Sequence, residues 1–176
     1  MKEENPYSPP QADISTNEPV IEEFIGINDV KGIGGWLIVP VIGLFLTSIQ
    51  MVFIFPTIFL PIFTTEVWAE LTTPGTAGYH ALFGPIIIFE LVMNLAFFTS
   101  SIIGLVLLFK KKRLFPRFMI GFYMAHFILI SIDHVLSNML PGSGSSIFEI
   151  AGSFVRLAVW GSYMVMSKRV KATFVN

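Results

Sequence analysis

Four long apolar stretches constrain the fold of this chain more than any other feature of its sequence. They run over residues 34–59, 82–109, 115–137 and 146–166. A transmembrane helix needs about 20 mostly apolar residues to cross about 30 Å of hydrocarbon, and each stretch is long enough. Helices of a soluble bundle keep a polar face, whereas these stretches are apolar nearly all round. The sequence therefore predicts an all-α membrane protein, a bundle of four transmembrane helices.

Proline and glycine residues predict where the first helix and the segment after it end. Proline has no N–H to donate within a helix, and its ring clashes with the preceding turn. Pro56 and Pro61 are therefore expected to kink or end the first helix near residue 59. The segment TTEVWAEL, residues 64–71, is expected to form one or two helical turns at the membrane interface, and Pro74 and Gly75 end it.

The low charge content supports a membrane protein and excludes several other classes. Only 13% of the 176 residues are charged, whereas soluble domains carry about 25%. The formal net charge of −1 provides no basic surface for nucleic acid. The chain has no cysteine, which excludes disulfides and thiolate metal sites. The expected partners are the lipid bilayer, other membrane proteins and anionic lipids, and no nucleic acid.

Residues 1–30 differ in composition from the rest of the chain. They contain seven acidic residues, one basic residue and several prolines. Such a segment cannot bury enough apolar surface to offset the entropy of ordering the chain, so a disordered acidic tail is expected before a transmembrane domain of residues 31–176. The tail segment NPYSPPQA either docks into an aromatic-lined groove of a partner or is an inert polar stretch. The residues of this motif are Asn5, Pro6, Tyr7, Pro9 and Pro10.

The positions of the basic residues predict the orientation of the chain in the membrane. Of 11 lysines and arginines, four lie between the second and third stretches, a fifth lies at the start of the third, and three follow the fourth. Basic loops stay on the cytoplasmic side, so both termini are expected in the cytoplasm. The same residues also suit anionic lipid headgroups. They are Lys110, Lys111, Lys112, Arg113, Arg117, Lys168, Arg169 and Lys171.

Six polar residues inside the predicted spans form a candidate cluster: Glu90, Asn94, His126, Asp133, Glu149 and Arg156. Ionisable groups at membrane depth are costly and usually face the interior of a helix bundle. Arg156 shares a helix face with Glu149, Ser153 and Trp160. Asp133 shares one with Tyr123 and His126. We therefore expect a polar core that opens toward the outer side of the membrane.

Depth along the helices indicates which of these residues can meet. At a rise of 1.5 Å per residue, Arg156 lies ~15 Å and Glu90 ~12 Å below the outer ends of their helices. Asp133 and Glu149 lie only ~5 to 6 Å deep, so Glu90 is the acid best matched to Arg156. Three interpretations stay open. An Arg156–Glu90 pair fixes the helix register, the cluster binds an anion or passes protons, or Arg156 meets an acid on another membrane protein.

No residue pattern nominates a catalytic, cofactor or metal site. His126, Asp133 and His134 are the only grouping of metal-ligand types, and their spacing turns His134 about 100° away from the other two. The chain lacks an H-E-x-x-H zinc motif and a G-x-S-x-G nucleophile elbow. We predict no cofactor and no enzymatic activity.

Two segments at the ends of the predicted membrane domain are similar to those of a known family. They are KGIGGWLIVPVIGL, residues 31–44, whose glycines favour close backbone packing, and SKRVKATF, residues 167–174. Over about residues 31–175 the chain resembles the uncharacterised bacterial inner-membrane proteins of domain-of-unknown-function family twenty-five sixty-nine. The resemblance implies four spans in a bacterial inner membrane and supplies no catalytic residue. The matching positions are Gly34, Gly35, Trp36, Leu37 and residues 167–174.

These features predict a small non-enzymatic protein of the bacterial inner membrane that acts by lateral or tail-mediated association with other membrane components. The alternative is a small transporter, channel or transporter subunit that uses the outer-facing cluster of Glu90, Asp133 and Arg156. The two predictions differ in where the function resides, either on the surface and in the tail or in the polar core.

Overall fold

The computed structural model describes residues 31–64, 66–140 and 146–176, and every regular element in these ranges is helical. The predicted tail, with its motif of Asn5, Pro6, Tyr7, Pro9 and Pro10, lies outside the described residues. The elements are η2 (Gly35–Leu37), α2 (Ile38–Ile54), η3 (Phe55–Phe59), α3 (Leu60–Thr64), α4 (Val67–Thr72), α5 (Phe83–Phe109), α6 (Leu114–Ser137), α7 (Ile147–Met166) and α8 (Lys168–Thr173).

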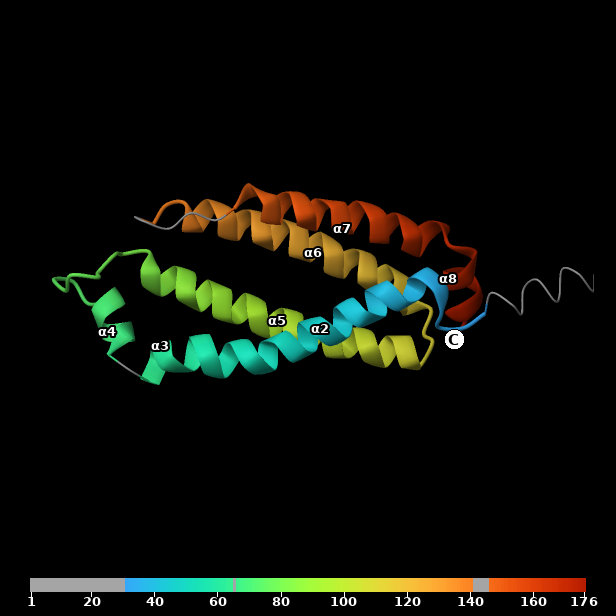
Figure 1. Ribbon diagram of the computed structural model, residues 1–176, viewed down its shortest axis with the longest axis horizontal. Helices are drawn as coiled ribbons and strands as arrows, with labels where there is room; N and C mark the ends of the chain where they lie inside the picture. The colour runs from blue at the N-terminus through green and yellow to red at the C-terminus, as the bar shows by residue number, and fades with distance from the viewer. Residues whose placement is uncertain (1–30, 65, 141–145) are drawn as a thin grey trace, which may run out of the picture.

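The long helices are arranged as two pairs (Figure 1). Helix α2 packs along α5, α6 packs along α7, and α5 also contacts α6. The two pairs meet at the end of the molecule that carries α8 and the C-terminus, and they diverge toward the end that carries α4. We call these the closed end and the splayed end.

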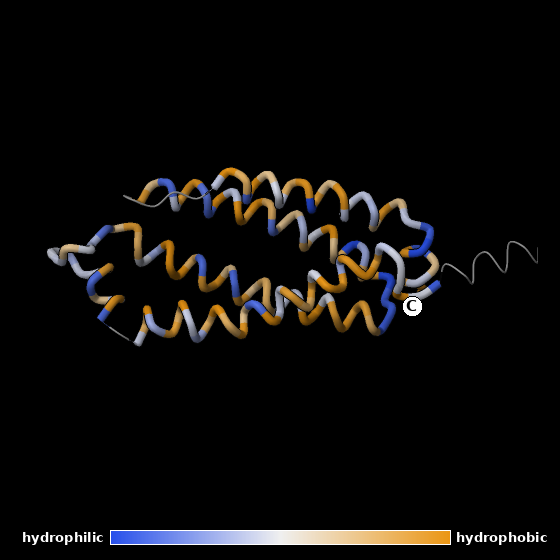
Figure 2. The backbone as a smooth tube through the Cα atoms, viewed as in Figure 1, coloured by the Kyte–Doolittle hydropathy of each residue, from blue (hydrophilic) through white to orange (hydrophobic). Residues whose placement is uncertain are grey.

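Within the residues that the structure describes, three helices are long and apolar enough to cross a membrane, judged by length and composition. They are Gly35–Thr64 with 30 residues, Phe83–Phe109 with 27 and Leu114–Ser137 with 24. Figure 2 shows that they are mostly hydrophobic, with isolated hydrophilic positions along their lengths. Helix α7 has 20 residues and coincides with the predicted fourth span, but it carries Glu149 and Arg156 and is not among the three. The fold is therefore compatible with a multi-pass membrane protein.

The first long helix extends beyond its predicted end. It continues past Pro56 and Pro61 to Thr64, and residues 55–59 form a π-helical turn. In this turn the N–H of Leu60 donates to the carbonyl of Phe55, five residues earlier. The wider turn accommodates residues that lack an N–H and clash with the preceding turn, so the helix continues through the prolines instead of ending at them.

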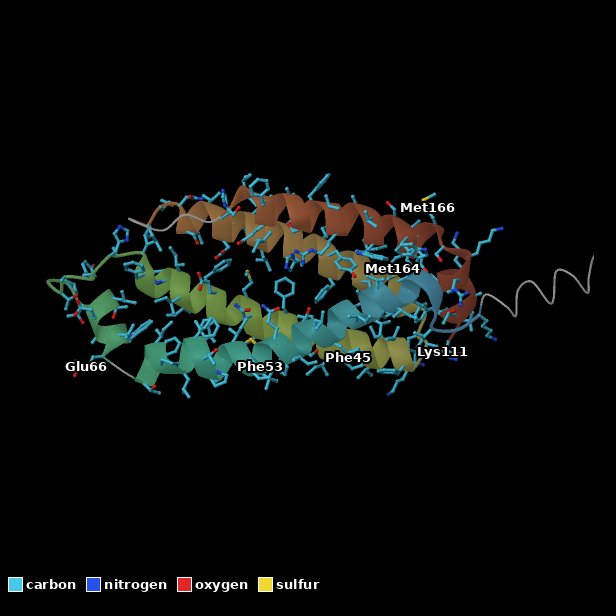
Figure 3. The ribbon with its side chains drawn as sticks, in the orientation of Figure 1. Phe45, Phe53, Glu66, Lys111, Met164 and Met166 are labelled. Atoms are coloured by element: carbon cyan, nitrogen blue, oxygen red, sulfur yellow. The ribbon has the colours of Figure 1, made fainter. Side chains whose placement is uncertain are left out.

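Apolar side chains pack together at the closed end. Met164 is 2% exposed and points into this core, whereas Met166, two residues later, is 75% exposed (Figure 3). Phe115 stacks on Phe174, with 4.5 Å between ring centroids. The buried core residues are Leu37, Leu44, Leu108, Phe115, Met119, Met164, Val170 and Phe174.

Hydrogen bonds join two segments at the closed end, residues 31–37 and residues 167–176. We call this arrangement the terminal clasp. The N–H of Gly32 donates to Thr173 Oγ1 over 2.9 Å, and that hydroxyl donates back to the Gly32 carbonyl over 3.2 Å. The backbone N–H of Arg113 donates to the carbonyl of Asn176 over 2.6 Å. Helix α8, which no sequence pattern predicted, supplies Thr173 and so makes the clasp.

The glycines at the start of the first helix pack closely, as predicted. A Cβ on Gly34 would lie 3.3 Å from a guanidinium nitrogen of Arg169, and one on Gly35 would lie 3.6 Å from Arg169 Nε. Gly35 also has a φ of 56°, in the left-handed region that favours glycine. The side chain of Arg169 therefore lies against bare backbone.

Candidate functional site

A cavity of about 470 Å³ lies between the two helix pairs and is lined by all four long helices. Its floor includes Leu44 and Met119, which also belong to the apolar core of the closed end. Polar side chains make up much of the remaining wall. They are Thr47 and Gln50 from α2, Glu90 and Asn94 from α5, Tyr123, His126 and Asp133 from α6, and Ser153, Arg156 and Trp160 from α7.

The cavity brings together five of the six residues of the predicted cluster: Glu90, Asn94, His126, Asp133 and Arg156. The sixth, Glu149, is exposed in the first turn of α7 and does not line the cavity. The other members of the predicted helix faces line the cavity too: Tyr123 with Asp133, and Ser153 and Trp160 with Arg156. The prediction that Glu149 shares the inward face of Arg156 is wrong, because Glu149 lies in the exposed first turn of α7. The contribution of Thr47 from the first helix was not foreseen, since one threonine in an apolar stretch carries no signal.

Glu90 and Asp133 lie at a similar depth in the cavity, and we call this depth the acidic level. Their charges lie close enough to interact, and the charge of Asp133 also interacts with Glu149 and His134. Asp133 Oδ1 is buried and accepts no hydrogen bond from the residues that the structure describes. A buried acceptor without a donor costs about 1–3 kcal/mol, so this carboxylate has an unmet requirement for a donor.

Asn94 and Ser153 are satisfied within their own helices. Asn94 Nδ2 donates to the carbonyl of Glu90 over 2.8 Å, and Ser153 Oγ donates to the carbonyl of Ile150 over 2.8 Å. These bonds stop the two polar side chains from being orphaned in an apolar bundle. Asn94 keeps its amide oxygen as an acceptor toward the cavity it lines.

Arg156 lies at a different level from the acids. Its charge interacts with Tyr123 and His126 on the neighbouring helix α6. Its Nε donates to the carbonyl of Gly152 in the preceding turn, over a long 3.4 Å. The side chain is exposed, and within the described ranges no carboxylate forms an ion pair with it.

The match between Arg156 and Glu90 that helix depth suggested does not appear as an ion pair in the described part of the chain. Both residues line the same cavity, but α7 packs on α6 and α5 packs on α2, so the two residues belong to different helix pairs. The charge that interacts with Glu90 is on Asp133 instead. Depth along a helix does not reveal which helices adjoin.

Aromatic rings form the wall beside His126. Phe97 of α5 lies 5.2 Å from His126 and 5.4 Å from Phe122, measured between ring centroids. His126 is therefore held among aromatic rings and away from the acidic level. No group of three His, Cys, Asp or Glu residues that could hold a metal ion occurs in the part of the chain that the structure describes.

The cavity has two charged levels along α6. Phe97 of α5 lies beside His126, and Phe154 of α7 lies 5.7 Å from Phe127, measured between ring centroids. Because α5 and α7 both run antiparallel to α6, Arg156 lies near the level of His126. Glu90 lies near the level of Asp133, seven residues further along α6, which is about 10 Å along a helix. Helix α6 runs from the closed end to the splayed end. The guanidinium level therefore lies deeper, and the acidic level lies nearer the splayed end.

The predicted basic residues gather at the opposite end from the acidic level. They occupy the connection from α5 to α6, the start of α6, and helix α8, which all lie at the closed end (Figure 2). Lys111 is labelled there in Figure 3. Arg113 is held by the clasp, because its Nε donates to the carbonyl of Val175 over 2.6 Å.

Comparison with known proteins identifies a family but no activity. A family model described as "Protein of unknown function (DUF2569)" matches residues 30–175. Neither the curated proteins nor the solved structures yielded a match to the chain. The two end segments on which the resemblance rests, residues 31–44 and 167–174, contact each other in the terminal clasp.

Proposed function

We propose that this chain, which belongs to the DUF2569 family of proteins of unknown function, binds a small polar solute in its cavity as a transporter or a subunit of one. The observation that carries the proposal is the cavity of about 470 Å³ with polar groups from all four long helices. Ligand sites in proteins have volumes of about 300–1,000 Å³. Polar groups inside a membrane bundle are costly, and they usually line a pathway or a binding site.

The proposal treats α7 as a fourth transmembrane helix. Its 20 residues correspond to about 30 Å of helix, which matches the hydrocarbon core of a bilayer. The side chain that lowers its hydropathy most, Arg156, lines the cavity, and a cation there is compatible with a span. Its packing along α6 also supports this assignment.

The basic closed end supports an orientation. Lysines and arginines mark cytoplasmic loops, and the two basic segments lie at the closed end with the C-terminus. We infer that this end is cytoplasmic and that the cavity faces the outer side. The resemblance to bacterial inner-membrane proteins favours that membrane.

Cysteine labelling tests whether the cavity holds water. The natural chain has no cysteine, so Thr47→Cys places a single thiol in the cavity wall. Thr99→Cys is the matched control, because both threonines donate to the carbonyl four residues earlier, over 2.9 Å, and Thr99 is exposed without lining the cavity. We expect an impermeant maleimide, added outside right-side-out vesicles, to label the first and not the second. No labelling of Thr47→Cys before denaturation would overturn the proposal.

Association with another membrane protein is the second candidate, and it rests on Arg156. An exposed arginine whose hydrogen bond is a long one to its own helix is able to meet an acid on a partner. The test is to purify wild type and Arg156→Leu from native membranes in mild detergent and compare the proteins that co-purify. Loss of one specific protein from a mutant that stays folded supports association. An unchanged set of proteins counts against it.

A further inference from the structure

The charges in the cavity are separated, and this limits what it can bind. Acidic groups of Glu90 and Asp133 lie nearer the splayed end, and the guanidinium of Arg156 lies about 10 Å deeper along α6. A simple anion would meet the acidic level on its way to Arg156, and a simple cation would leave Arg156 without a counter-ion. Neither fits the whole site.

The acidic level suits an ammonium group. The carboxyl groups of Glu90 and Asp133 repel each other when both are ionised, and a cation between them would replace this repulsion with attraction. Asp133 Oδ1 also has no hydrogen-bond donor among the described residues. A primary ammonium brings several N–H donors and a positive charge together.

The deeper level suits an acidic group. Arg156 uses Nε in a long bond to Gly152, and the remaining guanidinium donors have no partner in the part of the chain that the structure describes. A guanidinium matches the geometry of a carboxylate or a phosphate and binds either through paired hydrogen bonds. Tyr123, which lines the same wall, offers a hydroxyl at this level.

The lining between and around the two levels includes apolar side chains. Met93, Phe97, Phe98 and Ile130 line the cavity together with the charged residues. Such a wall favours an apolar spacer between the two ends of a ligand. It disfavours a ligand that carries both charges on one carbon.

We infer that the cavity recognises a zwitterion, with its ammonium group between Glu90 and Asp133, its acidic group on Arg156 and an apolar spacer between them. The inference rests on the proposed function, since it names the class of solute for the same site. Two kinds of ligand carry these two groups. One is a free amino acid with separated charges, and the other is a lipid headgroup with its amine and phosphate.

Trp160 provides a reporter for this binding because it lines the cavity. The chain has 3 tryptophans, and Trp36→Phe with Trp68→Phe leaves Trp160 as the only one. The full chain is placed in phosphatidylcholine nanodiscs and titrated with 6-aminohexanoate, glycine, hexanoate and hexylammonium, and the fluorescence of Trp160 is followed. We expect 6-aminohexanoate to bind at least tenfold more tightly than each of the other three.

Two variants test which residue binds each end of the ligand. Asp133→Asn should weaken 6-aminohexanoate about tenfold or more and leave hexanoate unchanged, because the carboxylate meets only the ammonium. Arg156→Gln should weaken 6-aminohexanoate similarly and leave hexylammonium unchanged. Lys168→Gln, a charge removal on α8 away from the cavity, is the matched control and should change nothing.

The lipid composition of the nanodiscs distinguishes the two possible sources of the ligand. If phosphatidylethanolamine in place of phosphatidylcholine weakens 6-aminohexanoate, the lipid headgroup occupies the site; if it has no effect, a free solute does. Equal binding of hexanoate, hexylammonium and 6-aminohexanoate overturns the zwitterion and leaves the solute-binding function intact. Absence of binding by all four probes, together with an unlabelled Thr47→Cys, overturns both.

Discussion

The closed and splayed ends of the molecule are built from the same helices by opposite means. At the closed end, eight buried apolar side chains pack together, and the terminal clasp bonds one part of the chain to another 141 positions away. Toward the splayed end the helix pairs diverge, and polar residues from α2, α5, α6 and α7 line a cavity. Helix α6 contributes Phe115 to the first region and Asp133 to the second.

This contrast indicates how the molecule divides stability from function. The core cluster and the hydrogen bonds of the terminal clasp lie where the helix pairs meet, so the closed end can hold the four helices in register. The cavity carries groups that are incompletely satisfied, such as Asp133 Oδ1. Functional sites commonly contain residues that are unfavourable for stability. Variants at the two ends should therefore behave differently.

The largest expected effect is at the closed end. Phe115 is fully buried and stacks on Phe174, so Phe115→Ala should lower the free energy of unfolding by about 3–5 kcal/mol through lost packing and a cavity. Thermal unfolding in detergent measures it. Phe53→Ala is the control, because Phe53 is 64% exposed and points away from the bundle (Figure 3). Equal losses of unfolding free energy in the two variants would contradict the idea that packing at the closed end provides the stability.

A smaller effect is expected in the clasp. Gly35 has a φ of 56°, and an alanine in that conformation costs about 1–2 kcal/mol. Gly35→Ala should therefore lower the unfolding temperature. The control is Gly121→Ala in α6, where a Cβ meets nothing within 4 Å and the helix should gain about 0.5–1 kcal/mol. The reverse order of the two unfolding temperatures would show that the clasp backbone is not constrained.

The smallest effect, of opposite sign, is expected in the cavity. Asp133→Asn removes a charge that is partly buried beside Glu90, so the free energy of unfolding should stay unchanged or rise by about 0.5–1 kcal/mol. The same thermal assay measures this in the apo protein. A loss as large as that of Phe115→Ala would identify Asp133 as a structural residue and would blur the difference between the two ends.

The extents of the long helices were predictable because they depend on local hydrophobicity. Helices α5, α6 and α7 begin and end within one residue of the stretches identified from sequence. The first helix was longer than expected, because the effect of two prolines depends on whether a π-helical turn can absorb them. Helix α8 is only six residues long, and its stability comes from its contacts at the closed end, which no local pattern reveals.

Five of the six residues of the predicted cluster line the cavity, but the way in which they pair was not predictable. The 3.6-residue period places Tyr123, His126 and Asp133 on one face. The free-energy cost of exposing polar groups to lipid predicts that this face points inward. The period does not tell which helix lies opposite. Arg156 faces Tyr123 and His126, and Glu90 faces Asp133, because α7 pairs with α6 while α5 contacts α6 from the other pair.

Local chemistry alone therefore determined the helical architecture, the lengths of α5, α6 and α7 and the polar faces of α6 and α7, since apolar length and helical period are properties of neighbouring residues. Only the tertiary structure decided that the two end segments meet, that the helix pairs diverge, and that the acids and the arginine occupy separate levels of one cavity. These features depend on contacts between residues far apart in sequence, and such contacts are set by packing of whole helices and not by any single stretch.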